Sequence, residues 1–304
     1  MFDLQVNGLS TKEFSCDFWQ APDDESITAL RKHELEMGIE KFLATLITAP
    51  LDQIKKNLER IKVYKDRFSE TEGAEIYGVH MEGGLISKLG IHPEANAREF
   101  NLENVKELIK EFPGLIKLWT LCPKMDSNGD ITKLLQDSGI KVAYGHSQAN
   151  YDEAMEAFEK YKVNLVTHWP NALKTFPGFK HRGGTKADVE TLENLDINNV
   201  IDSSEIGIAV AAYQNPDIYV TAIAGSEEDG DLHMDGYLLH KLAEKKKGKF
   251  ILVSDSVACY GEGSLRGGRV TLGKHLENAL ANMVEIHDVQ AATSISPYEV
   301  MDLK

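Results

Sequence analysis

The sequence has few cysteines, no long apolar run and a shortage of positive charge. Its three cysteines, Cys16, Cys122 and Cys259, show no CxxC spacing, which argues against a thiolate zinc site and against a disulfide framework. No run approaches the roughly 18 apolar residues of a membrane span, and the first residues lack the charged and apolar regions of a signal peptide. We therefore expect a soluble, cytoplasmic protein with reduced thiols.

The charge balance is strongly acidic. The 304 residues include 48 Asp and Glu against 33 Lys and Arg, which gives a formal net charge of -15 at pH 7. Such a field would repel nucleic acid and anionic membranes, so a small molecule is the expected partner. Because 42% of the residues are hydrophobic, the chain can bury a large core, as one large α/β domain or as two smaller ones.

Apolar runs alternate with amphipathic segments along the chain. Strands are expected at residues 2–6, 39–47, 76–79, 115–121, 218–224 and 250–253, with two more runs that end just before His146 and His168. Helices are expected at residues 26–37, 50–61, 102–109, 150–161, 206–213, 237–245 and 276–283, and a short one after Pro297. This alternation predicts a closed (β/α)8 TIM-type barrel as a single domain over residues 1–304. A doubly wound open sheet would show a similar pattern.

Two histidines close consecutive apolar runs. His146 ends one run and His168 ends the next, and between them Asn150 can cap a helix with Glu153 three positions on. In a parallel β/α arrangement the two strand ends meet at one rim, so the imidazoles would lie side by side. A single histidine beside a strand is more often a surface or hydrogen-bonded residue than a ligand. Because the geometry repeats in adjacent units, we interpret the pair as a metal site.

Other polar residues follow strands at the same expected rim. Gln5 and Asn7 come with the first strand, Glu82 with the third and Asp255 with the eighth. A carboxylate and two imidazoles are a normal ligand set for catalytic zinc or iron, and a further carboxylate can then move a proton. The alternatives are a helix cap for Asp255 and an exposed loop residue for Glu82, but the shared rim favours a functional role for both.

Seven short motifs occur in order along nearly the whole chain. They are DLQVNG at residues 3–8, TLITAP at 45–50, HMEG at 80–83, GIHP at 90–93, GHS at 145–147, THWPNA at 167–172 and SDS at 254–256. One such motif would be a weak signal, but the ordered series resembles the N-acetylglucosamine-6-phosphate deacetylases of the amidohydrolase superfamily. The resemblance implies an amidohydrolase barrel that removes an N-acetyl group from an amino sugar phosphate.

The resemblance also implies a role for individual residues. One divalent metal, zinc or alternatively iron, would be held by Glu82, His146 and His168, with Asp255 as general base and acid. Gln5 and Asn7 stand where many amidohydrolases carry an HxH pair for a second metal, and amides are poor ligands for such metals, so one metal is expected. His92 would help to polarise the substrate as well as bind it. The residues expected to bind the substrate are His92, Asn171, Ala172, Arg182, His233, Leu265, Arg266 and Gly267.

The chain also departs from the family pattern. The family's HLEGP reads HMEGG at residues 80–84, and its Arg-Glu-Pro-Gly turn is replaced by an insertion that reaches residue 207. Arg182, with Lys180 and His181, would then replace the family's phosphate-binding arginine, on a long connection at residues 169–199 that we expect to close over the ligand. We further expect a barrel without the family's small β-sandwich domain, assembled as a homodimer.

Two other functions remain open from the sequence. The altered segment after His168 would suit an amidohydrolase acting on a different N-acyl compound or a cyclic amide. A non-catalytic barrel that only binds a sugar phosphate is the third hypothesis, and metal content would separate it from the enzymes, since a binding protein has no need of the Glu82, His146 and His168 set.

Overall fold

The computed structural model describes residues 1–67, 73–96, 100–180, 184–197, 202–225, 233–258, 268–282 and 284–303. Eight strands form one parallel sheet whose spatial order follows the chain: β1 (Phe2–Val6), β4 (Lys41–Ile47), β5 (Glu75–Glu82), β6 (Ile116–Leu121), β7 (Lys141–Tyr144), β8 (Leu165–Val166), β9 (Tyr219–Ala222) and β10 (Phe250–Leu252). Because the order never reverses, a doubly wound sheet is excluded. The predicted TIM-type barrel is confirmed.

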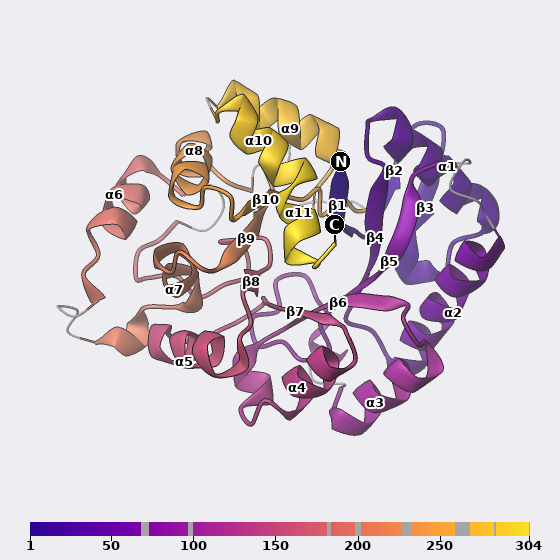
Figure 1. The fold of residues 1–304 in the computed structure, drawn as a ribbon, viewed down its shortest axis with the longest axis horizontal. Coiled ribbons are helices and arrows are strands. Elements are labelled where there is room, and N and C mark those ends of the chain that lie inside the picture. The colour runs from indigo at the N-terminus through magenta and orange to yellow at the C-terminus, as the bar shows by residue number, and fades with distance from the viewer. Residues whose placement is uncertain are drawn as a thin grey trace.

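Helices surround the strands on the outside, except the last one, which lies over the ring of strands (Figure 1). They are α1 (Asp24–Glu36), α2 (Leu51–Arg67), α3 (Leu102–Glu111), α4 (Asp130–Asp137), α5 (Tyr151–Tyr161), α6 (Lys186–Asn194), α7 (Ile208–Gln214), α8 (Gly236–Lys245), α9 (Leu272–Ala281), α10 (Ile286–Ser294) and α11 (Ser296–Val300). Asn150 and Glu153 form the predicted capping box at the start of α5. Among the described residues, none of these helices has the length and apolar character needed to cross a membrane.

The barrel contains two apolar cores. The larger one lies between the helices and the outer faces of the strands, and it includes residues such as Leu30, Leu58 and Leu108 on the inward faces of α1, α2 and α3. The smaller one draws Phe2, Leu4, Leu43, Leu118, Ala143, Leu165, Tyr219, Ile223, Ile251, Val253 and Val300 from seven strands or their ends and from α11. Such an inner layer is what fills a TIM barrel, so the polar site has to lie beyond it, at the rim.

The seam between the first and last strands is closed largely through side chains. The Asp3 carboxylate accepts a hydrogen bond from the Ser254 backbone N–H at 3.2 Å, and the Ser254 hydroxyl donates to the Gln5 carbonyl at 3.1 Å. Further along, the backbone N–H groups of Asn7 and Gly8 both donate to the Ser256 carbonyl. These contacts hold the carboxyl ends of β1 and β10 together.

Several elements differ from the sequence-based prediction. β5 continues through His80, Met81 and Glu82 instead of ending at Val79, because these residues pair with both β4 and β6. Gly8 begins a hairpin of β2 (Gly8–Ser10) and β3 (Ser15–Asp17), which the sequence did not predict. This hairpin is the one further sheet among the described residues.

Three helices were not predicted at all: α4, α6 and α10. α4 follows Gly129, which has a left-handed backbone and offers no side-chain cap, so the usual start signal is missing. α6 lies within the long connection after His168 and begins with a capping box between Thr185 and Asp188. That connection is therefore partly helical rather than a plain loop.

Candidate metal centre

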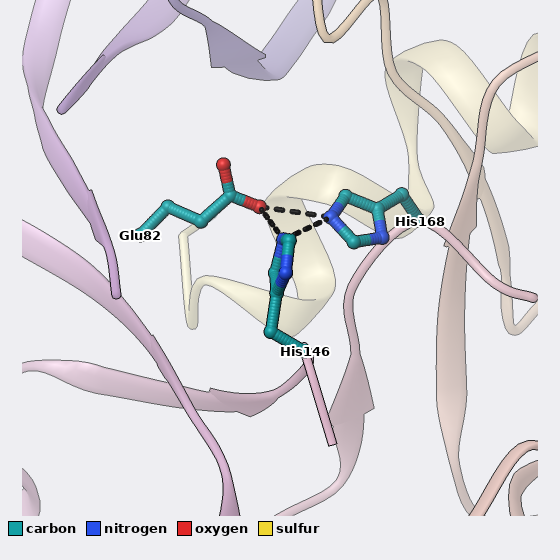
Figure 2. A group of neighbouring side chains, drawn as sticks. All are labelled: Glu82, His146 and His168. Atoms are coloured by element: carbon teal, nitrogen blue, oxygen red, sulfur yellow. Dashed lines mark hydrogen bonds and ion pairs between the residues drawn. The ribbon is translucent and has the colours of Figure 1, made fainter. Parts of the chain in front are cut away.

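Glu82, His146 and His168 converge at the carboxyl end of the barrel (Figure 2). Glu82 Oε1 lies 2.9 Å from His168 Nε2 and 3.3 Å from His146 Nε2, and the two imidazole nitrogens are 3.1 Å apart. All three side chains are buried. Within the described ranges, this is the one group of three or more His, Cys, Asp or Glu side chains close enough to hold a metal ion. The structure brings the three predicted ligands together, and their role as ligands stays a prediction.

Backbone carbonyls orient both imidazoles. His146 Nδ1 donates to the carbonyl of Lys88 at 2.9 Å, and His168 Nδ1 donates to the carbonyl of Asn171 at 3.1 Å. A carbonyl can only accept, so each ring carries a proton on Nδ1, and Nε2 is the nitrogen that would offer its electron pair to a bound metal. Outer hydrogen bonds of this kind are typical of metal-binding histidines.

The strand ends share an unusual backbone conformation. His146, His168 and Asp255 have φ angles of 46°, 31° and 48°, in the left-handed region that non-glycine residues seldom adopt. Each of these residues directly or closely follows a strand, so the bend turns its side chain across the top of the barrel. Strain of this kind gathers at functional sites, where the surrounding structure holds it.

The charges in this group fit a bound cation. Burial opposes a positive charge on His168, but the hydrogen bond and charge of Glu82 outweigh it and raise the pKa of His168 to about 9. Burial also raises the pKa of Glu82, yet the hydrogen bonds from His146 and His168 hold it well below its usual value. The space between Glu82 Oε1, His146 Nε2 and His168 Nε2 thus favours a positive charge. A ligand set of two imidazoles and one carboxylate suits zinc or iron in particular.

Asp255 lies beside the ligand group and is held by two amides. Its Oδ1 accepts hydrogen bonds from Gln5 Nε2 and Asn7 Nδ2, each at 2.8 Å. Gln5 Nε2 also donates to Glu82 Oε1 at 2.9 Å. The amides therefore direct N–H groups at the carboxylates, and an N–H group cannot coordinate a metal, so a single metal stays a prediction.

His92 stands next to the ligands as a neutral ring. Burial, followed by the nearby His146, lowers the pKa of His92 to about 3. The Thr48 backbone N–H donates to His92 Nδ1 at 3.4 Å, so Nδ1 is an acceptor and the Thr48 hydroxyl, 2.7 Å away, donates to it as well. The remaining ring proton is then on Nε2, which lies 3.8 Å from Glu82 Oε2 and can donate within the site.

The other predicted substrate residues divide into two groups. Asn171 and Ala172 follow β8 at the same rim, and the buried Asn171 Nδ2 has no hydrogen-bond partner among the described residues. His233 is also buried and is not one of the three clustered ligands. Arg182, Leu265, Arg266 and Gly267, together with His181, lie outside the described residues.

Sequence reasoning missed the hydrogen-bonding parts of the site. Gln5 and Asn7 were interpreted as replacements for metal ligands, not as donors to Asp255. Thr48 was not singled out, although a polar residue directly after a long apolar strand is the same signal that identified His146 and His168. His80, within the HMEG motif, is not part of the ligand group and instead contacts the Leu4 carbonyl and the Thr120 hydroxyl.

Comparisons with known proteins agree with the geometry. The N-acetylglucosamine-6-phosphate deacetylase of Bos taurus is 33% identical over 180 residues, which cover 57% of this chain and 42% of that protein. The enzyme of the same name from Haemophilus influenzae is 26% identical over 303 residues, 98% of this chain and 68% of its own length. The chain is thus similar in sequence to N-acetylglucosamine-6-phosphate deacetylases. No protein-family model matches it.

A solved structure with the same fold supports the barrel architecture. The N-acetylglucosamine-6-phosphate deacetylase from Pasteurella multocida superposes with a TM-score of 0.78 at 22% sequence identity, over 99% of this chain and 76% of the other. At that identity the likeness concerns the fold. The match to the mammalian relative, in turn, spans less than half of that protein's length.

Proposed function

We propose that this protein is a metal-dependent hydrolase that removes the acetyl group from N-acetylglucosamine-6-phosphate or a closely related amino sugar phosphate. The observation that carries the proposal is one buried network in which Gln5 joins the Glu82, His146 and His168 group to Asp255. A metal-ligand set and an adjacent carboxylate are the two components that amide hydrolysis needs. The names of the curated relatives supply the substrate class.

The residues divide the chemistry between them. A divalent metal bound by Glu82, His146 and His168 would polarise the amide carbonyl and lower the pKa of a water molecule to roughly 7. Asp255 accepts the proton of the attacking water and then donates it to the departing nitrogen, which would otherwise be a poor leaving group. Since Oδ1 of Asp255 already accepts hydrogen bonds from two N–H groups, Oδ2 is the oxygen that carries the proton.

His92 supplies the third chemical role. Its Nε2–H can donate to the carbonyl oxygen as negative charge develops there, and a well-placed donor of this kind contributes roughly 3 kcal/mol. The low pKa of His92, about 3, keeps the ring neutral over the working pH range. It therefore acts as a hydrogen-bond donor and not as a proton carrier.

The finer parts of the proposal are the metal, the phosphate and the assembly. Zinc is the proposed metal, with iron as the alternative, because both accept nitrogen and oxygen ligands. The unpartnered Asn171 Nδ2 is a donor available to the substrate, and Lys180 or Arg182 would contact the phosphate. We further propose a homodimer and a cytoplasmic location, which sedimentation and cell fractionation would test.

Acetate release by the Asp255→Asn variant tests the proposal. An amide can neither accept the water proton nor deliver it, so kcat should fall by at least about 10²-fold while the metal and the fold remain. Asp302→Asn is a matched control, since Asp302 also has a left-handed backbone, with a φ angle of 56°, but its side chain is 86% exposed. It should keep wild-type activity.

Two results decide between the proposed function and its alternatives: the N-acyl compound that the wild type prefers, and the size of the fall in kcat in Asp255→Asn. N-acetylated sugar phosphates and other N-acyl compounds should be compared, and preference for a different N-acyl compound would replace the proposed substrate. If Asp255→Asn kept more than about a tenth of the wild-type kcat, another residue would have to carry the proton.

A further inference from the structure

The side-chain amide of Gln5 contacts two carboxylates at once, which the sequence does not predict. Gln5 lies near the end of β1 with 1% of its surface exposed, and its Nε2 contacts Glu82 Oε1 at 2.9 Å and Asp255 Oδ1 at 2.8 Å. A side-chain amide nitrogen carries two hydrogens, so each carboxylate receives one. One amide group thus links a predicted metal ligand to the predicted proton carrier.

The orientation of this amide follows from its partners. Both neighbours are carboxylate oxygens, which accept hydrogen bonds, so the reversed amide would place its carbonyl oxygen against two acceptors. Hydrogen bonds to ionised acceptors are among the stronger kinds, and burial strengthens them further. Gln5 therefore has a single favourable arrangement, and it fixes Glu82 and Asp255 relative to each other.

The backbone of Gln5 is itself held on both sides. Its N–H donates to Asp3 Oδ1 at 3.1 Å, and its carbonyl accepts the Ser254 hydroxyl at 3.1 Å. Ser254 precedes Asp255, and its own N–H donates to the Asp3 carboxylate. The seam between β1 and β10 therefore places Gln5 and Asp255 together before any substrate binds.

Asn7 offers a comparison within the same site. It also donates to Asp255 Oδ1, at 2.8 Å, but no contact with Glu82 is found for it. Asn7 can therefore orient Asp255, whereas Gln5 orients Asp255 with respect to the metal ligands. Only the contacts of Gln5 fix the distance between the proposed proton carrier, Asp255, and the atoms that would bind the metal.

We propose that Gln5 is a positioning residue that sets Asp255 at a fixed distance from the metal ligands, and so places the carboxylate where the attacking water and the leaving nitrogen meet. This inference rests on the proposed function. Because Gln5 acts through Asp255 and not on the substrate, its loss should lower kcat and leave KM nearly unchanged. Misplacement of a catalytic group by about 1 Å can cost about 10²-fold in rate.

A double-mutant cycle with Asp255 tests the inference. Gln5→Met keeps most of the side-chain volume but has no donor, and its kcat should be about 10- to 100-fold below wild type, with KM within about twofold. About one metal per chain should remain, because Glu82, His146 and His168 are intact. In the Asp255→Asn background the same change should have almost no further effect on kcat, since the group that Gln5 positions has lost its function.

Each other outcome overturns the inference in a recognisable way. Equal losses in the two backgrounds would assign Gln5 a structural role, and loss of metal from Gln5→Met would assign it to metal binding. Wild-type kcat in Gln5→Met would make the network incidental. Gln5→Asn, whose shorter amide cannot reach both carboxylates, gives the same cycle if the methionine variant fails to fold. A wild-type protein without acetate release would overturn the proposed function and this inference together, whereas an active wild type isolates Gln5.

Discussion

At the scale of single residues, Glu34 shows a buried charge that the proposed chemistry does not use. The side chain on α1 is fully buried, and neither carboxylate oxygen has a hydrogen-bond partner among the described residues. Burial, and then the nearby Asp3, raises the pKa of Glu34 well above its ordinary value. The folded protein therefore holds a proton on Glu34 more tightly than the unfolded chain does.

Replacing Glu34 by methionine should stabilise the protein, and more so at high pH. Because the folded-state pKa is raised, the wild type keeps its full stability below the ordinary pKa of Glu and loses it as pH rises through the raised value. The methionine variant has no such loss, so its advantage in free energy of unfolding should grow from pH 5 to pH 8 and reach at least about 1 kcal/mol. Urea denaturation at both pH values measures this difference.

Glu36→Met is the matched control, since Glu36 lies on the same helix but is exposed. Asp3, whose pKa burial raises to about 6, adds its own pH dependence to the wild type and to both variants. A Glu34→Met advantage that did not change with pH would show that the buried carboxyl is not the cause.

The sequence predicted the residue types at the rim, but not how they bond. Glu82, His146, His168 and Asp255 could be found because each lies at or just beyond the end of an apolar run. The partners could not, because Gln5 and Asp255 are 250 positions apart and their contact depends on how the barrel closes. The order of polar and apolar residues along the chain does not show which distant residues come into contact.

At the scale of elements, the junction after β5 depends on a glycine. Gly83 has a φ angle of 118°, and a Cβ there would lie 2.0 Å from Thr48 Oγ1 and 3.0 Å from His92 Nδ1. The glycine therefore allows the end of β5 to pass close to the Thr48–His92 pair. The departure of this motif from the family's HLEGP leaves this glycine in place.

Gly83→Ala should impair activity as well as stability. The added methyl group must displace Thr48 and break its hydrogen bond to His92, so we expect kcat to fall by at least about tenfold, as an oxyanion donor is misplaced. Gly139→Ala is the control, because Gly139 also has a positive φ angle, 72°, but a Cβ there meets nothing within 4 Å. It should lose about 1 kcal/mol of stability and no activity. Equal kcat values for the two variants would remove His92 from the mechanism.

The strands could be predicted better than the short helices. All eight barrel strands were found because buried parallel strands are continuous apolar runs. Their ends were less certain, since β5 continues through polar residues that pair on both sides. α4 was missed because it starts without a side-chain cap, and α6 because it lies in the long connection after His168, which was expected to close over the ligand.

At the scale of the whole molecule, the fold brings distant segments to one buried point. The ligand group comes from β5 and from the ends of β7 and β8, while Gln5 and Asp255 come from the seam of β1 and β10. On the remaining side the amides of Gln5 and Asn7 donate N–H groups to Glu82 and Asp255, which supports the proposal of a single metal. The proposed function is therefore that of a hydrolase with one metal per chain.

Titration of metal-stripped protein with zinc, followed by acetate release from N-acetylglucosamine-6-phosphate, tests that claim most directly. The stripped protein should be almost inactive, and activity should rise linearly with added zinc and reach a plateau at about one equivalent per chain. A plateau at two equivalents would contradict the single site, and full activity in the stripped protein would contradict metal-dependent hydrolysis altogether.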